Sequence, residues 1–157
     1  MKRLVAIALL GLAAPAAAQD RAVPYWASLK SGQAMMRSGP GENYPGVWLY
    51  QRQGLPMRVL RRHENWRLVQ DSEGTRGWML FRLLTEQRTV LIKGNGPRSV
   101  HAKADESSRV RYLAEPGVVG RIDNCGEGWC HITFGAREGH IKVADIWGVD
   151  PGETVKD

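Results

Sequence analysis

The residues with the clearest chemical potential lie near the end of the chain. Cys125 and Cys130 enclose the loop Gly-Glu-Gly-Trp, and His131 follows directly. A cysteine thiolate beside a histidine is a recognised nucleophile, so one interpretation is a small Cys/His-dependent hydrolase or a thiol redox protein. Haem attachment is not indicated, because the spacing is Cys-x4-Cys-His and not Cys-x2-Cys-His.

The local pattern around these cysteines favours a structural disulfide. If the loop closes a β-hairpin, Cys125 and Cys130 face each other at Cα separations of ~4.5–5.5 Å, which a disulfide can span. Adjacent residues of a strand point to opposite faces, so His131 cannot activate Cys130 directly. We therefore predict a Cys125–Cys130 disulfide that stabilises the fold by roughly 2 kcal/mol.

Other catalytic or cofactor patterns do not emerge from the sequence. His63, His101 and His140 stand singly, whereas zinc sites commonly draw four ligands from paired motifs. Residues 94–96 (Gly-Asn-Gly) lack the following helix and lysine of a phosphate-binding loop. We predict no catalytic residue, no metal site and no cofactor.

Aromatic and basic side chains give the best functional lead. In a strand, alternate residues share a face, so Trp48 and Tyr50 lie opposite Val47 and Leu49. Because both faces cannot be fully buried in a single small barrel, Trp48 and Tyr50 either line a ligand groove or bury against a second barrel formed by the other half of the chain. The predicted ligand site combines apolar area with arginines that pair with carboxylates, and comprises Tyr44, Trp48, Tyr50, Trp66, Arg58 and Arg67.

Short strands separated by turn residues must position these groups. Eighteen glycines and eight prolines in 157 residues favour many tight turns, and no segment shows a sustained helical period. Five strands within about 55 residues describe a small barrel. In the first half we predict them at Ala34–Arg37, Val47–Tyr50, Met57–Arg62, Trp66–Val69 and Gly77–Leu80.

An internal repeat extends this pattern to the second half. Val47–Gln70 aligns with Val110–Thr133 at a constant offset of 63, with five identities in 24 positions. One-residue length changes on either side then match Met36 with Val100 and Gly77 with Gly139. The chain is therefore predicted to be all-β, with two tandem small barrels.

The amino terminus predicts export. Residues 1–18 combine Lys2 and Arg3, an apolar run over 4–12 and three alanines before a polar segment, the pattern of a signal peptide cleaved near Ala18. The apolar run is far below the ~20 residues that span a bilayer, so no transmembrane anchor is expected. Cleavage changes the formal net charge from +6 to +4, and we expect a periplasmic or secreted protein.

The ordered motifs of the first half resemble a bacterial SH3-like domain. They are Met-Arg-Ser-Gly-Pro-Gly at 36–41, Gly-Leu-Pro-Met at 54–57, Asn-Trp-Arg-Leu-Val at 65–69 and Gly-Thr-Arg-Gly-Trp-Met at 74–79. The second half resembles the same family in degraded form, with His140 where a tryptophan is expected. The resemblance covers about residues 26–149 and is closest to exported tandem SH3-like proteins of Gram-negative bacteria. It implies two SH3-like β-barrels that serve in cell-wall peptide recognition or as accessory modules.

From these observations we expect a non-enzymatic binding or scaffold protein. Its domains are a signal peptide (1–18), a first SH3-like domain (26–84), a disulfide-stapled second domain (88–149) and a polar tail (150–157). The expected partner is a cell-wall peptide or an envelope protein, recognised through the first barrel. Nucleic acid is a poor candidate outside the cytoplasm. The alternatives are the Cys/His enzyme and a purely structural subunit that docks through the Trp48 face.

Overall fold

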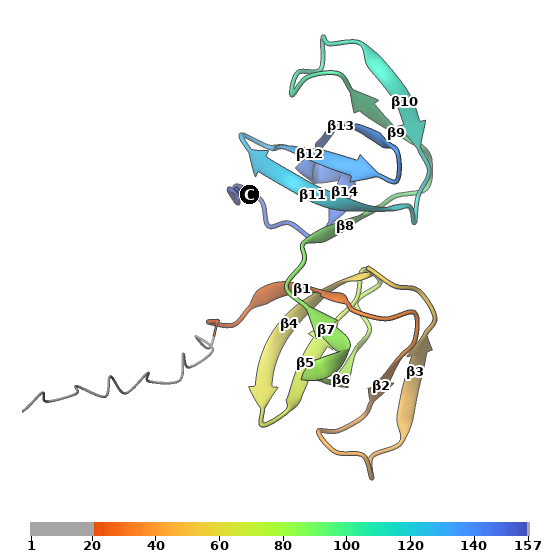
Figure 1. The fold of residues 1–157 in the computed structure, drawn as a ribbon, viewed down its shortest axis with the longest axis vertical. Coiled ribbons are helices and arrows are strands. Elements are labelled where there is room, and N and C mark those ends of the chain that lie inside the picture. Colours follow the sequence, from red (N-terminus) through yellow and green to blue (C-terminus); the bar gives the residue numbers. More distant parts are fainter. Residues whose placement is uncertain (1–20, 157) are drawn as a thin grey trace, which may run out of the picture.

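The computed structural model describes residues 21–156, which form two β-barrels joined end to end (Figure 1). The first barrel (orange to green) consists of β1 (Tyr25–Leu29), β2 (Ala34–Arg37), β3 (Gly46–Tyr50), β4 (Pro56–His63), β5 (Trp66–Gln70), β6 (Arg76–Leu80) and β7 (Leu84–Thr85). The second barrel (green to blue) consists of β8 (Thr89–Ile92), β9 (Arg98–His101), β10 (Val110–Ala114), β11 (Val119–Gly126), β12 (Trp129–Phe134), β13 (Arg137–Lys142) and β14 (Ile146–Trp147). The predicted signal peptide lies outside the described residues.

The two barrels have the same topology. The first sheet has the order β3-β2-β6-β5-β4-β1-β7, and the second repeats it as β10-β9-β13-β12-β11-β8-β14. Each barrel also has one 3-10 turn before its last strand, η1 (Phe81–Leu83) and η2 (Val143–Asp145), and the described residues contain no α-helix. The prediction of an all-β chain with two tandem SH3-like units is confirmed.

The strand register corrects one part of the internal alignment. Met36 pairs with Trp48 in the first barrel, and Val100 pairs with Tyr112 in the second. Trp48 therefore corresponds to Tyr112 and not to Arg111, which a constant offset of 63 would require. The difference in loop length therefore lies after β3 and β10 and not before them. Low sequence identity in this region left its position undetermined in the sequence alignment.

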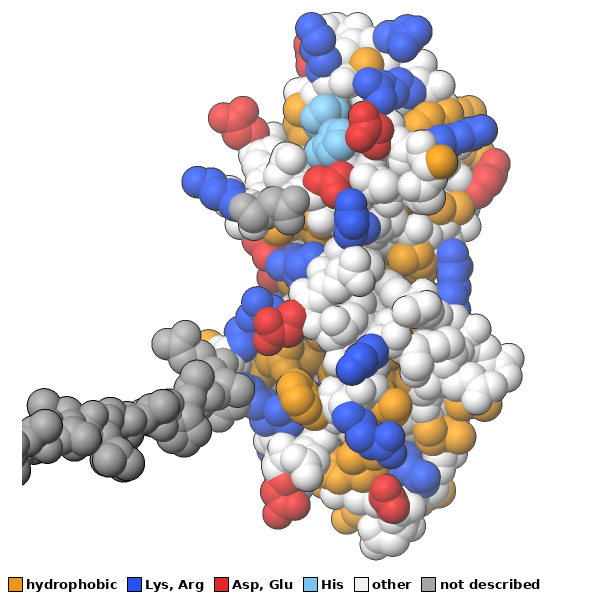
Figure 2. All heavy atoms as spheres, in the orientation of Figure 1, with side chains coloured by type: hydrophobic (Ala, Val, Ile, Leu, Met, Phe, Trp, Pro, Cys, Tyr) orange, Lys and Arg blue, Asp and Glu red, His pale blue; other side chains and the backbone are white. Residues whose placement is uncertain are grey.

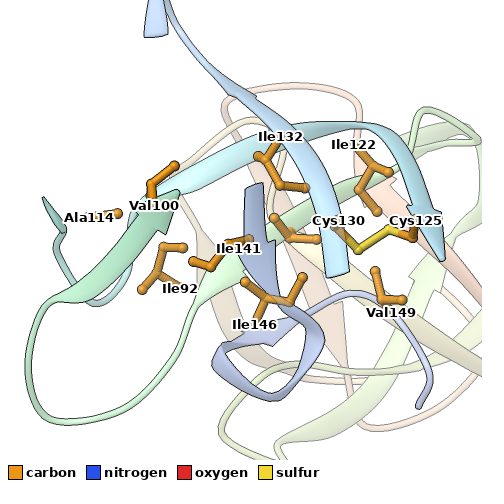
Figure 3. Close-up of a cluster of buried hydrophobic side chains, with 11 residues drawn as sticks. Ile92, Val100, Ala114, Ile122, Cys125, Cys130, Ile132, Ile141, Ile146 and Val149 are labelled. Atoms are coloured by element: carbon orange, nitrogen blue, oxygen red, sulfur yellow. A yellow bond between two sulfur atoms is a disulfide. The ribbon is translucent and has the colours of Figure 1, made fainter. Parts of the chain in front are cut away.

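Each barrel has its own hydrophobic core, and the two cores use different side chains. The first is rich in methionine, with Met36, Met57 and Met79 fully buried. The second is built mainly from isoleucine and valine, with the Cys125–Cys130 disulfide packed at one end (Figure 3). The sulfur atoms are 1.99 Å apart across the register pair of β11 and β12, so the predicted disulfide is confirmed.

Polar contacts join the barrels where β1 meets β8. Ser28 Oγ lies 2.6 Å from Thr89 Oγ1, and the Thr89 hydroxyl donates to the Gly54 carbonyl at 2.6 Å. Both Ser28 and Thr89 are buried, so these bonds lie in low-dielectric surroundings, where they contribute more than at the surface. The junction is a packed interface and not a free linker.

The segment after β14 is also tied to the second barrel. The Arg88 guanidinium donates to both carboxylate oxygens of Glu153, at 2.7 and 3.1 Å, and to the Gly148 carbonyl at 2.8 Å. Farther on, Val155 exchanges two backbone hydrogen bonds with Cys125. Residues 150–155 of the predicted polar tail are therefore held against the barrel.

Candidate binding clefts

The edge strand β3 carries the exposed part of the predicted ligand site. Trp48 is 59% exposed, whereas Tyr50 is buried at 6% exposure. Their ring centroids are 6.4 Å apart, so the two side chains share a face of β3, as the alternation predicts. Tyr50 thus anchors the strand in the core while Trp48 remains available.

A cleft of about 230 Å³ opens beside these rings, and we call it the Trp48 cleft. Leu91 of β8 contributes to one wall, so the cleft lies at the junction of the barrels. One residue of the second barrel thus borders the groove, although Trp48 itself stays exposed and is not buried against that barrel. The lining residues are Trp48, Tyr50, Leu55, Pro56, Met57, Asp71, Ser72, Glu73, Thr75 and Leu91.

The charge of this cleft is negative, because Asp71 and Glu73 line it and no lysine or arginine does. Asp71 accepts a hydrogen bond from the Tyr50 hydroxyl at 2.7 Å and one from the Thr75 backbone at 2.8 Å. Burial, together with the bond to Asp71, raises the pKa of Tyr50 far above its usual range, so its hydroxyl stays protonated and donating. Sequence reasoning missed Asp71 and Glu73, since both lie in a loop that reads simply as a turn.

The other four predicted site residues lie outside the Trp48 cleft. Tyr44 is exposed, and its ring packs against Gly39 in the loop before β3. Trp66 is buried in β5. The next residue, Arg67, is also buried, and it donates to the Glu64 carbonyl at 2.8 Å and stacks on Phe81 at 4.8 Å.

Arg58 points to a different surface from Trp48. Its guanidinium forms an ion pair of 2.7 Å with Asp150 and lies 5.3 Å from the Trp26 ring centroid. The expected combination of exposed aromatics with arginines at one site is therefore not assembled. The Trp48 cleft has aromatic and acidic groups instead.

The segment that contains Cys125, Cys130 and His131 has no free thiol. Cys125 and Cys130 are bonded to each other and buried, so neither offers a thiolate. His131 lies on the outer face, with Nδ1 3.0 Å from Asp123 Oδ2. Partial burial acts to raise the pKa of Asp123, but hydrogen bonds from Thr133 and His131 outweigh it and hold that pKa below its usual range.

Histidines that are separate in the sequence come together in the second barrel. His131 and His140 pair across β12 and β13 with ring centroids 4.8 Å apart, and His140 pairs with His101 across β13 and β9. Figure 2 shows histidine side chains gathered beside acidic ones on the surface of this barrel. A cross-strand row has no fixed sequence spacing, because its members come from three strands.

Within residues 21–156 no group of three or more His, Cys, Asp or Glu side chains is arranged to hold a metal ion. No helix in this part of the chain is long and apolar enough to cross a membrane.

Comparison with known families identifies the repeated barrel. The sequence model of the bacterial SH3 domain matches the chain twice, over residues 30–86 and 98–148. The chain belongs to the bacterial SH3 domain family. The two matches fall on the two barrels, so each barrel is one bacterial SH3 domain.

Individual relatives are distant. The chain is 24% identical over 138 residues to "Putative N-acetylmuramoyl-L-alanine amidase YrvJ" of Bacillus subtilis (strain 168), covering 80% of this chain and 25% of that protein. It therefore spans about a quarter of that relative. Among solved structures it is similar to NlpC2 and NlpC1 from Trichomonas vaginalis, at 14% and 10% identity and a TM-score of 0.34 for each. These matches cover 82% and 88% of this chain and 51% and 50% of those chains.

Proposed function

We propose that the protein is a non-catalytic binding module of the cell envelope that recognises a cell-wall peptide through the Trp48 cleft of its first barrel. The observation that carries this proposal is the exposed Trp48 ring on the wall of a cleft that also holds two carboxylates. The function is carried out by recognition alone, in the periplasm or outside the cell.

The chemistry of the cleft favours a peptide that bears an amino group. An exposed indole supplies a large apolar contact at low cost in side-chain entropy, which is why tryptophan is enriched at binding hot spots. The negative pair Asp71 and Glu73 attracts an ammonium group, and Tyr50 holds the Asp71 carboxylate in place. Peptide recognition therefore relies on acidic residues here, and not on Arg58 and Arg67.

Three observations support a cell-wall setting. The family match gives two bacterial SH3 domains, and the name of the distant relative describes an amidase of muramoyl peptides. The disulfide is typical of proteins that function in an oxidising compartment. It also removes both thiols from the competing Cys/His hydrolase or redox mechanism, so titration of the native protein with a thiol reagent is expected to find no free thiol.

The decisive experiment is a pull-down of the protein on purified peptidoglycan. Trp48→Ala is expected to weaken binding about tenfold, because it removes the central apolar contact. Val47→Ala is the matched control, since Val47 is an exposed neighbour on the opposite face of β3. Acetylation of the free amino groups of the peptidoglycan is expected to weaken binding of the unmodified protein as well.

A second pair of variants tests the acidic wall. Glu73→Gln removes one charge from the cleft and is expected to weaken binding severalfold, whereas Glu42→Gln removes an exposed charge outside it and leaves binding unchanged. Equal binding by Trp48→Ala and Val47→Ala, or no binding of peptidoglycan by the unmodified protein, would overturn the proposal. Binding that is insensitive to acetylation would contradict the amine part of it.

A further inference from the structure

A second and larger cleft lies on another side of the junction, and we call it the tryptophan cleft. Its volume is about 530 Å³, more than twice that of the Trp48 cleft. Three indoles line it, from Trp26 of β1, Trp129 of β12 and Trp147 of β14. Both barrels therefore contribute, and neither could form this surface alone.

The indoles are held in place before any ligand arrives. The rings of Trp26 and Trp147 meet edge to face at 87° with centroids 4.8 Å apart. Trp147 also donates its indole N–H to the Pro56 carbonyl at 3.3 Å. Pro56 itself lines the Trp48 cleft, and no residue of the described chain lines both clefts. A rigid aromatic wall lowers the entropic cost of binding an apolar group.

The far wall is formed by the segment after β14, where Asp150, Pro151 and Gly152 line the cleft. The bonds of Glu153 to Arg88 fix this segment. Burial acts to raise the pKa of Glu153, but the hydrogen bonds from Arg88 and the Asp150 backbone outweigh it and keep the pKa low. The Glu153 carboxylate therefore stays ionised at neutral pH, and its bonds to Arg88 hold the segment after β14 in place.

The charges of the cleft differ from those of the Trp48 cleft. Three cations line it, and among the contacts of the described residues Arg58 is paired with Asp150 and Lys142 with Glu106. Lys93 is exposed and its ammonium has no side-chain partner within residues 21–156. One further carboxylate, Glu127, stands on the rim. The cleft thus offers one unengaged cation beside a large apolar surface.

We propose that the tryptophan cleft binds the carboxyl end of a peptide whose last residue is apolar. The apolar side chain packs on Trp129 and Trp147, and the terminal carboxylate pairs with Lys93. A single negative charge fits this cleft better than an acidic run, because Glu127 and Asp150 would repel additional carboxylates. This site is distinct from the Trp48 cleft and does not depend on the proposed function.

The six tryptophans provide the test, because each indole N–H gives its own signal in a nitrogen-15 correlation spectrum of the labelled protein. The probes are acetyl-Ala-Leu with a free carboxylate and the same dipeptide with a carboxamide. The acid is expected to shift the Trp129 and Trp147 signals and leave Trp48 in place, and the amide is expected to bind at least about fivefold more weakly. An amine-bearing peptide that shifts Trp48 alone reports on the Trp48 cleft separately.

Two charge variants with opposite expected effects test the pairing of the peptide carboxylate with Lys93. Lys93→Gln is expected to weaken the acid about fivefold, whereas Glu127→Gln removes a competing carboxylate and is expected to strengthen it. Lys30→Gln is the matched control, since Lys30 is exposed and lines neither cleft. Equal affinity for the acid and the amide, or a shift centred on Trp48, would overturn the proposal whether or not peptidoglycan binds.

Discussion

The two barrels have the same topology but differ beside the edge strands β3 and β10. That difference determines which barrel has an acidic cleft. Three corresponding positions change together between the β3 corner and the β10 corner. The first barrel has Tyr50, Met57 and Asp71, and the second has Ala114, Gly120 and Phe134. In the second barrel the Phe134 ring covers Gly120, whereas in the first barrel the Trp48 cleft lies beside Met57 and Asp71. Exchange of volume among three side chains can therefore open or close a surface cleft within one fold.

The outer faces of the barrels differ as well. The cross-strand row Arg37, Trp78 and Leu68 of the first barrel becomes His101, His140 and His131 in the second. The hollow beside Tyr112 is lined by Arg111, Arg137 and Glu138, so it has an excess of one positive charge where the Trp48 cleft is acidic. Duplication has kept the cores apolar while the surfaces diverged in charge.

The largest expected effect comes from giving the second barrel a first-barrel side chain. In Gly120→Met, the added Cβ alone would collide with Ile132 and lie 2.7 Å from the Phe134 ring. We expect the free energy of unfolding to fall by about 3 kcal/mol in urea titrations. Gly126→Ala, where the added Cβ meets nothing within 4 Å, is the control. Adding Phe134→Ala to Gly120→Met should recover part of the loss, and no recovery would contradict the volume exchange described above.

The next largest effect is expected from removing the disulfide of the second barrel. The double change Cys125→Ala and Cys130→Ala is expected to lower the free energy of unfolding by about 2 kcal/mol, because it releases a short loop in the unfolded chain. The effect should appear in the Trp129 indole signal and spare Trp66, which lies in the first barrel. An equal loss of structure around Trp66 would mean that the barrels fold as one unit.

A smaller effect is expected at the junction. Thr89→Val removes the hydroxyl that bonds to the Gly54 carbonyl and leaves that carbonyl without its donor. We expect a loss of about 1–2 kcal/mol in the free energy of unfolding. Thr154→Val, at an exposed position, is the control. Identical unfolding curves for the two variants would show that this bond contributes nothing to the contact between barrels.

The smallest effect concerns the histidine row. Burial, followed by the neighbouring charge of His131, lowers the pKa of His140 below its ordinary value of 6.5. The unfolded chain therefore takes up a proton at this residue more readily than the folded chain, so stability should decline as the pH falls below 6.5 and level off below the folded pKa. In His140→Phe this part of the slope should vanish from urea titrations at successive pH values. A slope unchanged by the substitution would place its origin elsewhere.

Local sequence predicted the fold well, because the information is local. Turn residues, strand alternation and the repeat were enough for two barrels, and the hairpin spacing was enough for the Cys125–Cys130 bond. The position of the length change after β3 was missed, since only the pairing of Met36 with Trp48 reveals it.

The candidate site was predicted only in part, because its chemistry depends on residues far apart in sequence. Alternation placed Trp48 and Tyr50 on one face, but the Tyr50 hydroxyl is bonded to Asp71, which lies 21 residues away. Arg67 was predicted to belong to the ligand site, but it is buried and its guanidinium stacks on Phe81. The contact of Trp26 with Trp147 joins opposite ends of the described chain, so no local pattern could indicate it.

The backbone pairing of Val155 with Cys125 connects the disulfide to the wall of the tryptophan cleft. Cys125 exchanges hydrogen bonds of 2.9 and 3.0 Å with Val155, and the segment that ends there supplies Asp150, Pro151 and Gly152 to the tryptophan cleft. The disulfide joins Cys125 to Cys130 of β12, so it braces the strand end on which this segment rests, while the bonds between Arg88 and Glu153 hold the segment itself. One side of the tryptophan cleft is thus supported by a covalent bond that lies outside the cleft.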